Sequence, residues 1–413
     1  MRIESRVALA ALFTLGITAL SAAGCGSEGS DPGEAGGGQP TGSGSASSGS
    51  SASSGSSASS SSSVGSGGSG ATSGGGGETT GTGGSGGGGG SEQPAGTGGS
   101  GGSSGSGVPG GADFRLYGYA TTGDGTTGGK GGEVVSVSSL DALRTEAARS
   151  GAVIIQITGK MSGSGDDVDV ASDKTIVGVG SSGELEGIGL NLRRASNIII
   201  RNLKIHHVLA SSGNGDGIHM DESHNIWVDH CELWADSPAV NSNKDKYDGL
   251  IDATHESSDI TLSWNYLHDH WKGMLVGSSD NDDSDRRITF HHNRFNNINS
   301  RLPSYRGGNG HVYNNYFENV PTSGVNSRVG ACLRVEGNHF FKVQNPITTL
   351  DSPAGGTDRI DNVFEEVTGT QESGADCSWS APYEYPLDSS AAVKALVMEH
   401  AGVGKTDPLE NLP

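Results

Sequence analysis

A repeat of short strands constrains this chain more than any other feature of its sequence. Seven strand-like runs each end in a polar residue that is followed closely by another apolar pair: Ile198–Asn202, Ile226–His230, Ile260–Asn265, Ile288–Asn293, Val312–Asn315, Leu333–Asn338 and Arg359–Asn362. The last five runs all end in Asn, and these Asn residues lie 28, 22, 23 and 24 residues apart. A near-constant period in the twenties, built from strands with polar turns between them, predicts an all-β solenoid rather than a barrel or a sandwich.

The segment before the repeat adds strands and one helix. Ala152–Ile157 and Lys174–Val179 are short runs rich in β-branched residues, as strands are. Ser139 is a capping residue before apolar residues at helical spacing, and Gly151 closes this segment. It is the one convincing helix in the sequence, and we expect it to cap the N-terminal end of the solenoid.

Two physical properties explain Asn at the ends of the runs. Asn tolerates the left-handed backbone conformation that a sharp turn between two stacked sheets needs. Stacked Asn amides can also hydrogen-bond from one coil to the next. We therefore interpret these Asn residues as structural and assign them no chemistry.

The first residues have the features of an export signal. Arg2 and Arg6 precede an apolar run from Val7 to Leu20, which is too short to span a membrane. Small residues then lead to Cys25, as in a lipoprotein processing site. We expect residues 1–25 to be a signal with a lipidated Cys25, with a plain secretory signal as the alternative. The predicted location is secreted or cell-surface, as an outer-membrane lipoprotein.

Residues 26–107 differ in composition from the rest. They are almost all Gly and Ser and contain no Lys or Arg, so they cannot bury enough apolar surface to fold. We predict a flexible tether with an r.m.s. reach of about 50 Å. Residues 108–413 are long enough for one elongated repeat domain, which we expect to be a monomer. A net charge of −21 and the lack of a basic stripe argue against a nucleic-acid partner.

The cysteines beyond Cys25 are odd in number. They are Cys231, Cys332 and Cys377, so at most one internal disulfide forms and one thiol is left over. The sequence leaves the pairing open.

Long coils indicate where a site is built. Coils above the usual length carry excursions, which accumulate on one face of a solenoid, and the longest surround residues 205–256. Carboxylates and cations converge on that face: Asp216, Asp248, Asp252, Lys272, Arg301 and Arg306. Three carboxylates with little His or Cys nearby suit Ca²⁺ better than a transition metal, although loop aspartates are more often solvated turn residues.

Five sequence motifs follow one another in a specific order. They are Ile226-Trp227-Val228-Asp229-His230, the pair Asp248 and Asp252, Asp269-His270-Trp271-Lys272, Thr289-Phe290-His291-His292-Asn293 and Ser300-Arg301-Leu302-Pro303-Ser304-Tyr305-Arg306-Gly307. In content and order they resemble the motifs of the pectate lyases of polysaccharide lyase family one, over roughly residues 134–403. The resemblance implies a right-handed parallel β-helix and a lyase that needs calcium and acts on polygalacturonate, the polymer of demethylated pectin.

The resemblance also implies roles for single residues. The calcium ligands would be Asp216, Asp248 and Asp252. Arg301 is similar to the family's catalytic base. Lys272 and Arg306 correspond to the cations that bind substrate carboxylates, and Lys272 is also placed to stabilise developing enolate charge. Two positions differ from the common pattern, since Asn214 stands where an acidic residue is frequent and Asp248 where some relatives have Glu.

The implied reaction explains why these residue types occur together. β-Elimination removes the proton on the carbon next to a uronate carboxylate and expels the glycosidic oxygen, which gives 4,5-unsaturated oligogalacturonates. Calcium bound to that carboxylate would make the proton more acidic. Because a guanidinium is essentially always protonated in water, an arginine base needs neighbouring cations, and we expect activity to rise towards alkaline pH.

Other polar groups have structural interpretations. We expect Trp227, Asp229 and His230 to support the strands. A zinc site is an alternative for four histidines that we assign to turns and ladders: His268, His270, His291 and His292. The Asp-rich segment of residues 280–285 is interpreted as a solvated loop, with a second calcium site as the alternative.

Three rival functions remain open. A pectin lyase would share the fold but would act on methylated polymer without calcium, which the retained Asp216, Asp248 and Asp252 disfavour. A polygalacturonase would need paired Asp residues and an Arg-Ile-Lys motif, which are missing. A non-catalytic, surface glycan-binding β-helix would leave the convergence of Arg301, Lys272 and Arg306 without a reason.

Overall fold

The computed structural model describes residues 112–413 except residue 352. The predicted signal at 1–25 with Cys25, and the predicted tether at 26–107, lie outside the described residues. Within the described part of the chain, no helix is long and apolar enough to cross a membrane.

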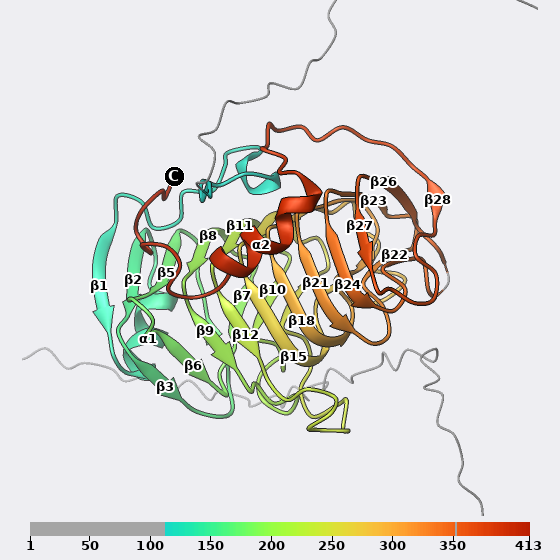
Figure 1. The fold of residues 1–413 in the computed structure, drawn as a ribbon. Coiled ribbons are helices and arrows are strands. Elements are labelled where there is room, and N and C mark those ends of the chain that lie inside the picture. Colours follow the sequence, from blue (N-terminus) through green and yellow to red (C-terminus); the bar gives the residue numbers. More distant parts are fainter. Residues whose placement is uncertain (1–111, 352) are drawn as a thin grey trace, which may run out of the picture. The chain divides into compact units, whose positions relative to one another are not determined.

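The described residues form a parallel β-helix with three sheets, as predicted (Figure 1). Sheet A contains β1 (Glu133–Val137), β2 (Val153–Ile157), β5 (Lys174–Gly178), β8 (Ser196–Arg201), β11 (His224–Asp229), β14 (Ser258–Ser263), β17 (Arg287–His291), β20 (Asn309–Tyr313), β23 (Cys332–Glu336), β26 (Gly356–Ile360) and β28 (Ala375–Asp376). Sheet B contains β3 (Lys160–Ser162), β6 (Glu184–Glu186), β9 (Lys204–His206), β12 (Glu232–Trp234), β15 (Tyr266–Lys272), β18 (Arg294–Ser300), β21 (Tyr316–Val320), β24 (His339–Val343) and β27 (Val363–Glu365). Sheet C contains β4 (Val168–Asp169), β7 (Leu190–Arg193), β10 (Ile218–Asp221), β13 (Ile251–Thr254), β16 (Leu275–Val276), β19 (Ser304–Arg306), β22 (Val325–Arg328) and β25 (Ile347–Thr348).

The predicted repeat corresponds to sheet A. All seven runs contribute strands to it, and equivalent positions lie in register from coil to coil. Ile226 pairs with Ile198 on one side and with Ile260 on the other, and Ile260 pairs with Ile288. All four side chains are fully buried or nearly so. Each such side chain contributes roughly 1.5–3 kcal/mol by leaving water, so the stacked aliphatic rows hold the coils together.

The turn from sheet A to sheet B carries the predicted Asn ladder. The side-chain amide of Asn265 donates to that of Asn293 at 2.9 Å, and the same bond joins Asn293 to Asn315, Asn315 to Asn338 and Asn338 to Asn362. The first four of these residues are almost fully buried. The ladder therefore satisfies amides that would otherwise be costly to bury.

The structure corrects one reason given for these Asn residues. The left-handed backbone conformation occurs one position earlier, at Trp264 (φ 53°), His292 (φ 54°) and Asn314 (φ 51°), and not at the ladder residues themselves. Asn is therefore suited to the ladder positions because its amide hydrogen-bonds to the next coil. The residue before it adopts the backbone conformation that makes the turn.

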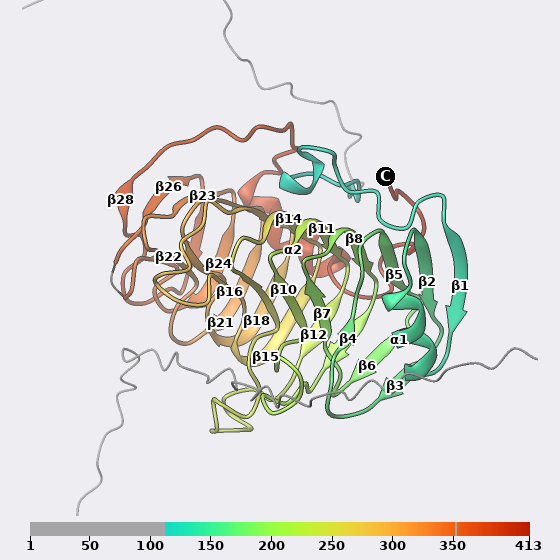
Figure 2. The ribbon, with the colours of Figure 1, turned by 180° about the vertical axis from the view of Figure 1, so that it is seen from behind.

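The predicted helix is α1 (Leu140–Ala148), and it covers the end of the solenoid beside β2 and β4 (Figure 2). The hydroxyl of Ser139 accepts a hydrogen bond from the N–H of Ala142 at 3.3 Å. Leu143 and Ala147 are fully buried against the solenoid core. A capped helix thus shields the apolar end that an uncovered first coil would expose.

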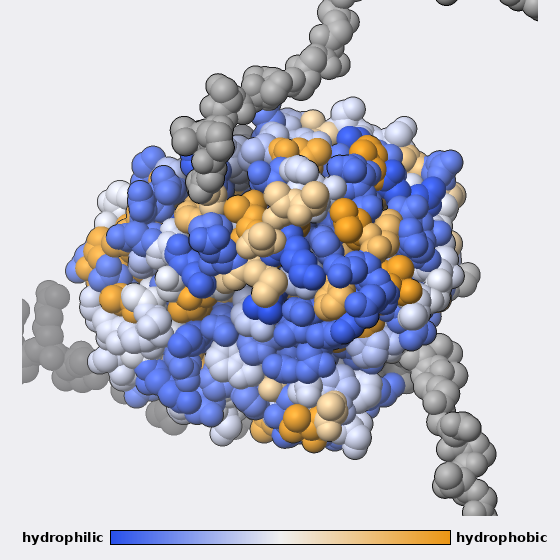
Figure 3. All heavy atoms as spheres, in the orientation of Figure 1, coloured by the Kyte–Doolittle hydropathy of each residue, from blue (hydrophilic) through white to orange (hydrophobic). Residues whose placement is uncertain are grey.

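A second helix, α2 (Ser390–His400), was not predicted. It packs Val393 and Val397 against Tyr316 and Phe341 of sheet B. Its N-cap, Ser389, makes no side-chain hydrogen bond, but the segment is rich in helix formers and Val393 and Val397 lie at helical spacing, so a local signal was present and was overlooked. Apolar and polar residues are mixed over this face of the molecule (Figure 3).

The structure resolves the cysteine pairing. Cys332 in β23 forms a disulfide with Cys377, which follows β28, and Cys231 is a buried free thiol. Cys231 also occupies the ladder position of its coil, where its N–H donates to the amide oxygen of Asn265 at 2.9 Å.

Candidate active site

The predicted site residues lie where sheet C meets the excursions that enter it from sheet B. Asp216 precedes β10, Asp252 lies in β13, and Asp248 belongs to the segment between β12 and β13. Lys272 ends β15, Arg301 follows β18, and Arg306 ends β19. Because β10 and β13 pair in parallel with Ile218 opposite Ile251, the two aspartate-bearing segments lie side by side.

Two predicted calcium ligands, Asp216 and Asp252, meet at Gly249. The N–H of Gly249 donates to Oδ1 of Asp216 at 2.7 Å. A Cβ atom at Gly249 would lie 2.2 Å from Oδ1 of Asp252, so a larger residue would push this carboxylate away. Oδ1 of Asp252 also accepts from the N–H of Leu275 in β16 at 2.9 Å. The two carboxylates are only 4% and 5% exposed, which places them in an environment where charge is costly.

The surroundings of Asp216 and Asp252 disfavour the charged form of both carboxyl groups. Burial raises the pKa of Asp252 well above its usual range, and the charges of Asp216 and Asp248 raise this pKa further. Burial also raises the pKa of Asp216, although a hydrogen bond from Nδ1 of His219 at 2.7 Å opposes that rise. Burial alone would lower the pKa of His219, but its bond to Asp216 and that residue's charge raise the pKa overall.

The third predicted ligand, Asp248, pairs with Lys272. Their Oδ1 and Nζ atoms are 3.2 Å apart, and Nζ lies equally far from Oδ1 of Asp245. The Asp248 side chain is 45% exposed. Among residues 112–413, residue 352 aside, no three His, Cys, Asp or Glu side chains are arranged so that they could hold a metal ion as they stand. The structure therefore brings the three aspartates near one another without a closed ligand set, and Asp248 pairs with Lys272 instead.

We refer to Asp216, Asp248 and Asp252 as the acidic cluster. Its donor chemistry fits calcium. All three side chains offer hard carboxylate oxygens, and Asp248 is accessible to solvent. A cation between them would offset the repulsion that raises the pKa of Asp252.

Arg301 differs from every other arginine that the structure describes. Its guanidinium makes no hydrogen bond or ion pair with a described residue, whereas each of the others has such a partner. Its backbone is in the left-handed region (φ 66°), which is uncommon for a residue with a side chain. Its carbonyl accepts from the N–H of Met274 at 2.7 Å, and its charge lowers the pKa of Asp252. The guanidinium of Arg301 thus lies near the acidic cluster without a hydrogen-bonding partner among the described residues.

Arg306 lies in sheet C, as Asp252 does. Its hydrogen bonds to Asp280 and Gly277 involve none of the other predicted site residues. Its Nε donates to Oδ1 of Asp280 at 3.0 Å and one terminal nitrogen donates to the carbonyl of Gly277 at 2.9 Å. Both partners belong to the loop between sheets C and A, at the opposite end of the short strand β19 from Arg301.

The motif around His230 is structural, as interpreted from the sequence. Asp229, His230 and Arg201 are fully buried in sheet A, where Nε of Arg201 lies 2.8 Å from Oδ2 of Asp229. Nδ1 of His230 bonds to the same oxygen at 2.7 Å, and Trp227 reaches Asp229 through the hydroxyl of Ser263. This network stabilises the strand and offers no group to a ligand.

Three of the four histidines for which zinc was the alternative stack on aromatic rings. His268 stacks between Trp234 and Tyr266, His292 lies against Trp264, and His291 lies against Tyr313. The fourth, His270, is buried and bonds to the backbone of Lys272 at 2.8 Å, and its burial lowers its pKa to about 4. All four therefore have structural contacts.

Sequence reasoning missed Gly249 and His219. Gly249 joins Asp216 to Asp252, and its only signal was its position between two predicted ligands. His219 lies beside Asp252 in the β10–β13 register. Two-residue alternation after Asp216 would have placed His219 and Asp221 on one face of the strand β10, a signal that the sequence analysis did not use.

Comparison with known proteins gives consistent matches. The family model described as pectate lyase matches residues 112–406. A pectate trisaccharide-lyase of Bacillus licheniformis is 46% identical over 307 residues, which cover 72% of this chain and 89% of that protein. Pectate lyase A of Aspergillus niger is 41% identical over 290 residues, which cover 69% of this chain and 87% of that protein.

Solved structures of similar fold carry related names. A pectate lyase of a Bacillus species, crystallised in complex with trigalacturonate, has a TM-score of 0.65 and 35% identity, covering 70% of this chain and 99% of that one. Pectate lyase C from Erwinia chrysanthemi, at pH 9.5 with 30 mM Ca²⁺, has a TM-score of 0.60 and 26% identity, covering 71% of this chain and 97% of that one.

Proposed function

This chain belongs to the pectate lyase family and is a polysaccharide lyase, and from that premise we propose that it cleaves polygalacturonate by calcium-dependent β-elimination. The base removes the proton on the carbon next to the uronate carboxylate, and the glycosidic oxygen leaves from the neighbouring carbon. The new double bond gives a 4,5-unsaturated oligogalacturonate.

The observation that carries this proposal is the uncommitted guanidinium of Arg301 beside the acidic cluster. Arginines that only support a fold are paired, as Arg201 is with Asp229. We assign Arg301 as the base that takes the proton. Because a base must lose its own proton before it can accept another, we expect activity to rise towards alkaline pH.

Lys272 and Arg306 are proposed to bind substrate carboxylates. Lys272 is also placed to stabilise negative charge on the uronate as the proton leaves. In the free protein the Asp245 and Asp248 side chains hold its ammonium group. Lys272 ends β15 of sheet B and Arg306 ends β19 of sheet C, so they suit carboxylates of different sugar units along one chain.

We propose Asp216, Asp248 and Asp252 as the residues that would hold calcium. When bound, the ion would withdraw charge from the substrate carboxylate and acidify the neighbouring proton. The raised pKa of Asp252 supports the assignment, since the carboxylates are crowded without a cation to balance them. Two similar proteins, one crystallised with Ca²⁺ and one with trigalacturonate, support calcium and an oligogalacturonate as ligands.

A spectrophotometric assay tests this function. The absorbance of the unsaturated uronate should rise when the protein is mixed with polygalacturonate and calcium, and it should stay flat with a chelator. Methylated pectin should be a poorer substrate than the demethylated polymer. Faster cleavage of methylated polymer that is indifferent to chelator would indicate a pectin lyase, and binding without any absorbance change would indicate a non-catalytic glycan-binding protein.

We also propose that the enzyme is exported and anchored through a lipid on Cys25. The support is the order of basic residues, apolar run and small residues before Cys25. Mass spectrometry of the N-terminus of protein purified from its native host should find an acylated Cys25. An unmodified N-terminus beyond Cys25 would indicate plain secretion.

A further inference from the structure

We propose that Asp280 is a positioning residue that holds the guanidinium of Arg306 ready for a substrate carboxylate. The proposal rests on the function proposed above, in which Arg306 binds substrate. Asp280 belongs to the loop of residues 277–286, which connects β16 in sheet C to β17 in sheet A. We refer to this segment as the acidic loop.

The acidic loop contacts Arg306 at several atoms. Asp280 accepts from Nε at 3.0 Å and the carbonyl of Gly277 accepts from a terminal nitrogen at 2.9 Å. The loop also holds the main chain, because the guanidinium of Arg286 donates to the carbonyl of Arg306 at 3.0 Å. A Cβ atom at Gly277 would lie 2.9 Å from Cβ of Arg306, so the loop and the strand are in close contact. The acidic loop therefore contacts both the side chain and the backbone of Arg306, in addition to the pairing of β19 with β16 and β22.

A second arginine makes the charge of Asp280 important. Arg328 in β22 is the register partner of Arg306 in β19, so two guanidinium-bearing residues are neighbours on sheet C. Their side chains are only 3% and 7% exposed. Oδ1 of Asp280 lies 3.5 Å from a terminal nitrogen of Arg328 as well as 3.0 Å from Nε of Arg306. Because like charges repel strongly where water is excluded, the carboxylate between them keeps the two guanidinium groups in place.

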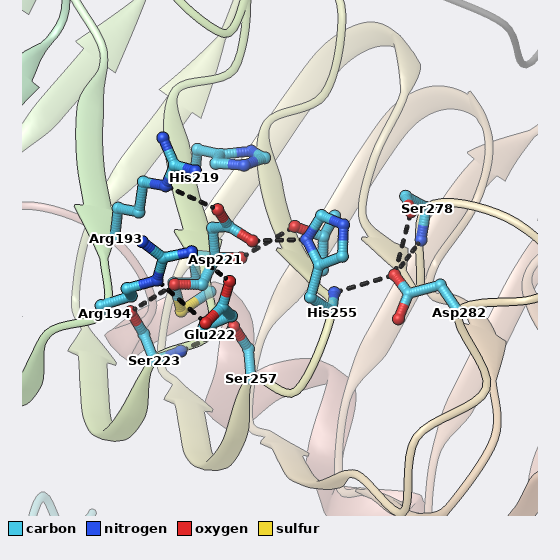
Figure 4. Close-up of polar contacts among 12 residues, drawn as sticks. Arg193, Arg194, His219, Asp221, Glu222, Ser223, His255, Ser257, Ser278 and Asp282 are labelled. Atoms are coloured by element: carbon cyan, nitrogen blue, oxygen red, sulfur yellow. Dashed lines mark hydrogen bonds and ion pairs between the residues drawn. The ribbon is translucent and has the colours of Figure 1, made fainter. Parts of the chain in front are cut away.

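Asp282 anchors the loop that carries Asp280 (Figure 4). Its Oδ2 accepts from the N–H of His255 at 2.8 Å, from the N–H of Ser278 at 2.7 Å and from the hydroxyl of Ser278 at 3.0 Å. Its other oxygen pairs with the buried guanidinium of Arg286. Most of residues 280–285 are exposed, as interpreted from the sequence, but Asp282 is buried and bound by protein groups. Asp280 and Asp282 are each bound by protein groups, which also disfavours the alternative of a second calcium site.

The test compares Asp280→Ala with wild type on trigalacturonate and polygalacturonate. Loss of the carboxylate should raise KM about fivefold, a smaller change than a fully buried charged hydrogen bond would give, because Asp280 is 47% exposed. kcat should stay within about twofold, since Arg301 and Lys272 make no contact with the loop. Asp280→Asn keeps an oxygen acceptor and should recover part of the lost affinity.

A matched control comes from the same loop. Asp283 is exposed, and its side chain makes no hydrogen bond or ion pair with another described residue. Asp283→Ala removes the same charge and should leave KM unchanged. Trigalacturonate binding by calorimetry, measured in an Arg301→Ala background to prevent turnover, should weaken about fivefold with Asp280→Ala and not with Asp283→Ala.

Two results would overturn the proposal. An unchanged KM in a folded Asp280→Ala protein would show that Arg306 is positioned without Asp280. A lowered KM would show that Asp280 competes with the substrate carboxylate. Failure of the proposed function has a different signature, since the wild-type protein would then produce no calcium-dependent unsaturated uronate from polygalacturonate.

Discussion

Asp229 in sheet A and Asp252 in sheet C are both buried carboxylates, but their surroundings are opposite. In sheet A, Asp229 is fully buried and is bound by Arg201, His230 and the hydroxyl of Ser263. In sheet C, Asp252 is almost as deeply buried, yet Asp216 and Asp248 surround it with further negative charge. Arg301 lowers the pKa of Asp252 through its charge, but neither Arg301 nor Lys272 forms a hydrogen bond with Asp252.

The difference separates structural from functional polar groups. A buried charge with a full set of partners stabilises the native state relative to its unpaired form, so removing one partner is costly. A buried charge without such partners costs stability in the free protein and persists where a ligand provides the missing interactions. On this criterion we propose that Asp252 belongs to the reactive site and that Asp229 supports the scaffold.

Removal of calcium should have the largest effect on activity. Dialysis against chelator should abolish formation of unsaturated uronate while the circular dichroism spectrum stays that of a β protein, because the solenoid core contains no predicted calcium ligand. Added calcium should restore activity. Chelated protein that kept full turnover would contradict the assignment of Asp216, Asp248 and Asp252.

Substitution in sheet A should affect stability and leave chemistry alone. Asp229→Ala leaves the buried guanidinium of Arg201 without its carboxylate, and breaking a buried pair costs about 3–5 kcal/mol. The measurement is the free energy of unfolding in urea, alongside kcat of the folded fraction. A large loss of kcat with little loss of stability would show that sheet A takes part in the reaction.

Substitution of Arg301 should do the reverse. Arg301→Ala should lower kcat at least about a hundredfold, the low end for removing a general base, with substrate binding retained. The melting temperature should change little because the side chain has no hydrogen-bonding partner among the described residues. Arg301→Lys keeps the charge but loses the guanidinium. A substantially active Arg301→Lys enzyme would show that this position supplies charge only, and Lys272 would then be the next candidate for the base.

The scaffold could be predicted from the sequence because its signals repeat. Five Asn residues at a near-constant spacing gave the solenoid, and the structure joins their amides one to the next. Helix α2 was overlooked although Val393 and Val397 lie at helical spacing, because its segment follows the repeat and belongs to no coil. The disulfide pairing also needed three dimensions, since Cys332 and Cys377 lie 45 residues apart in sequence and are joined only when the coils stack.

The candidate site was less predictable than the scaffold. The sequence indicated which residues share a face, but not which of them touch. It gave no sign that Lys272 would hold Asp248, or that Arg306 would be enclosed by the acidic loop instead of lying beside Arg301. Such choices depend on backbone groups, such as the N–H of Gly249, whose positions follow from the fold and not from the residue type.

Removing the proposed carboxylate-binding cations should have a smaller effect than removing the base. Lys272→Ala and Arg306→Ala should each raise KM and lower kcat, by roughly tenfold in kcat/KM, because their contacts exist in the ground state as well as the transition state. Lys272→Ala should lower kcat more, since it lies with Arg301 where β15 and β18 end. Equal effects of both substitutions on KM alone would place Lys272 outside the reaction centre.

The smallest effect concerns stability and has opposite signs in the two sheets. In the calcium-free protein, Asp252→Asn should raise the free energy of unfolding by about 1 kcal/mol at neutral pH, because it removes a crowded, buried charge. Asp229→Asn should lower it, because that charge is fully paired. Urea unfolding of both variants beside wild type measures the contrast. Calcium should stabilise the wild type and fail to stabilise Asp252→Asn.

The pH dependence of the free energy of unfolding tests whether Asp252 destabilises the calcium-free protein. Burial and the charges of Asp216 and Asp248 raise the pKa of Asp252 in the native protein, so the native state holds a proton that the unfolded chain releases above about pH 4. The stability linked to this proton is fully present below that pH and is lost as the pH rises through the raised native pKa. Wild-type protein without calcium should therefore lose stability over this range relative to Asp252→Asn. If the two curves ran parallel from pH 4 to pH 8, Asp252 would be as well compensated as Asp229, and the distinction between the two sheets would fail.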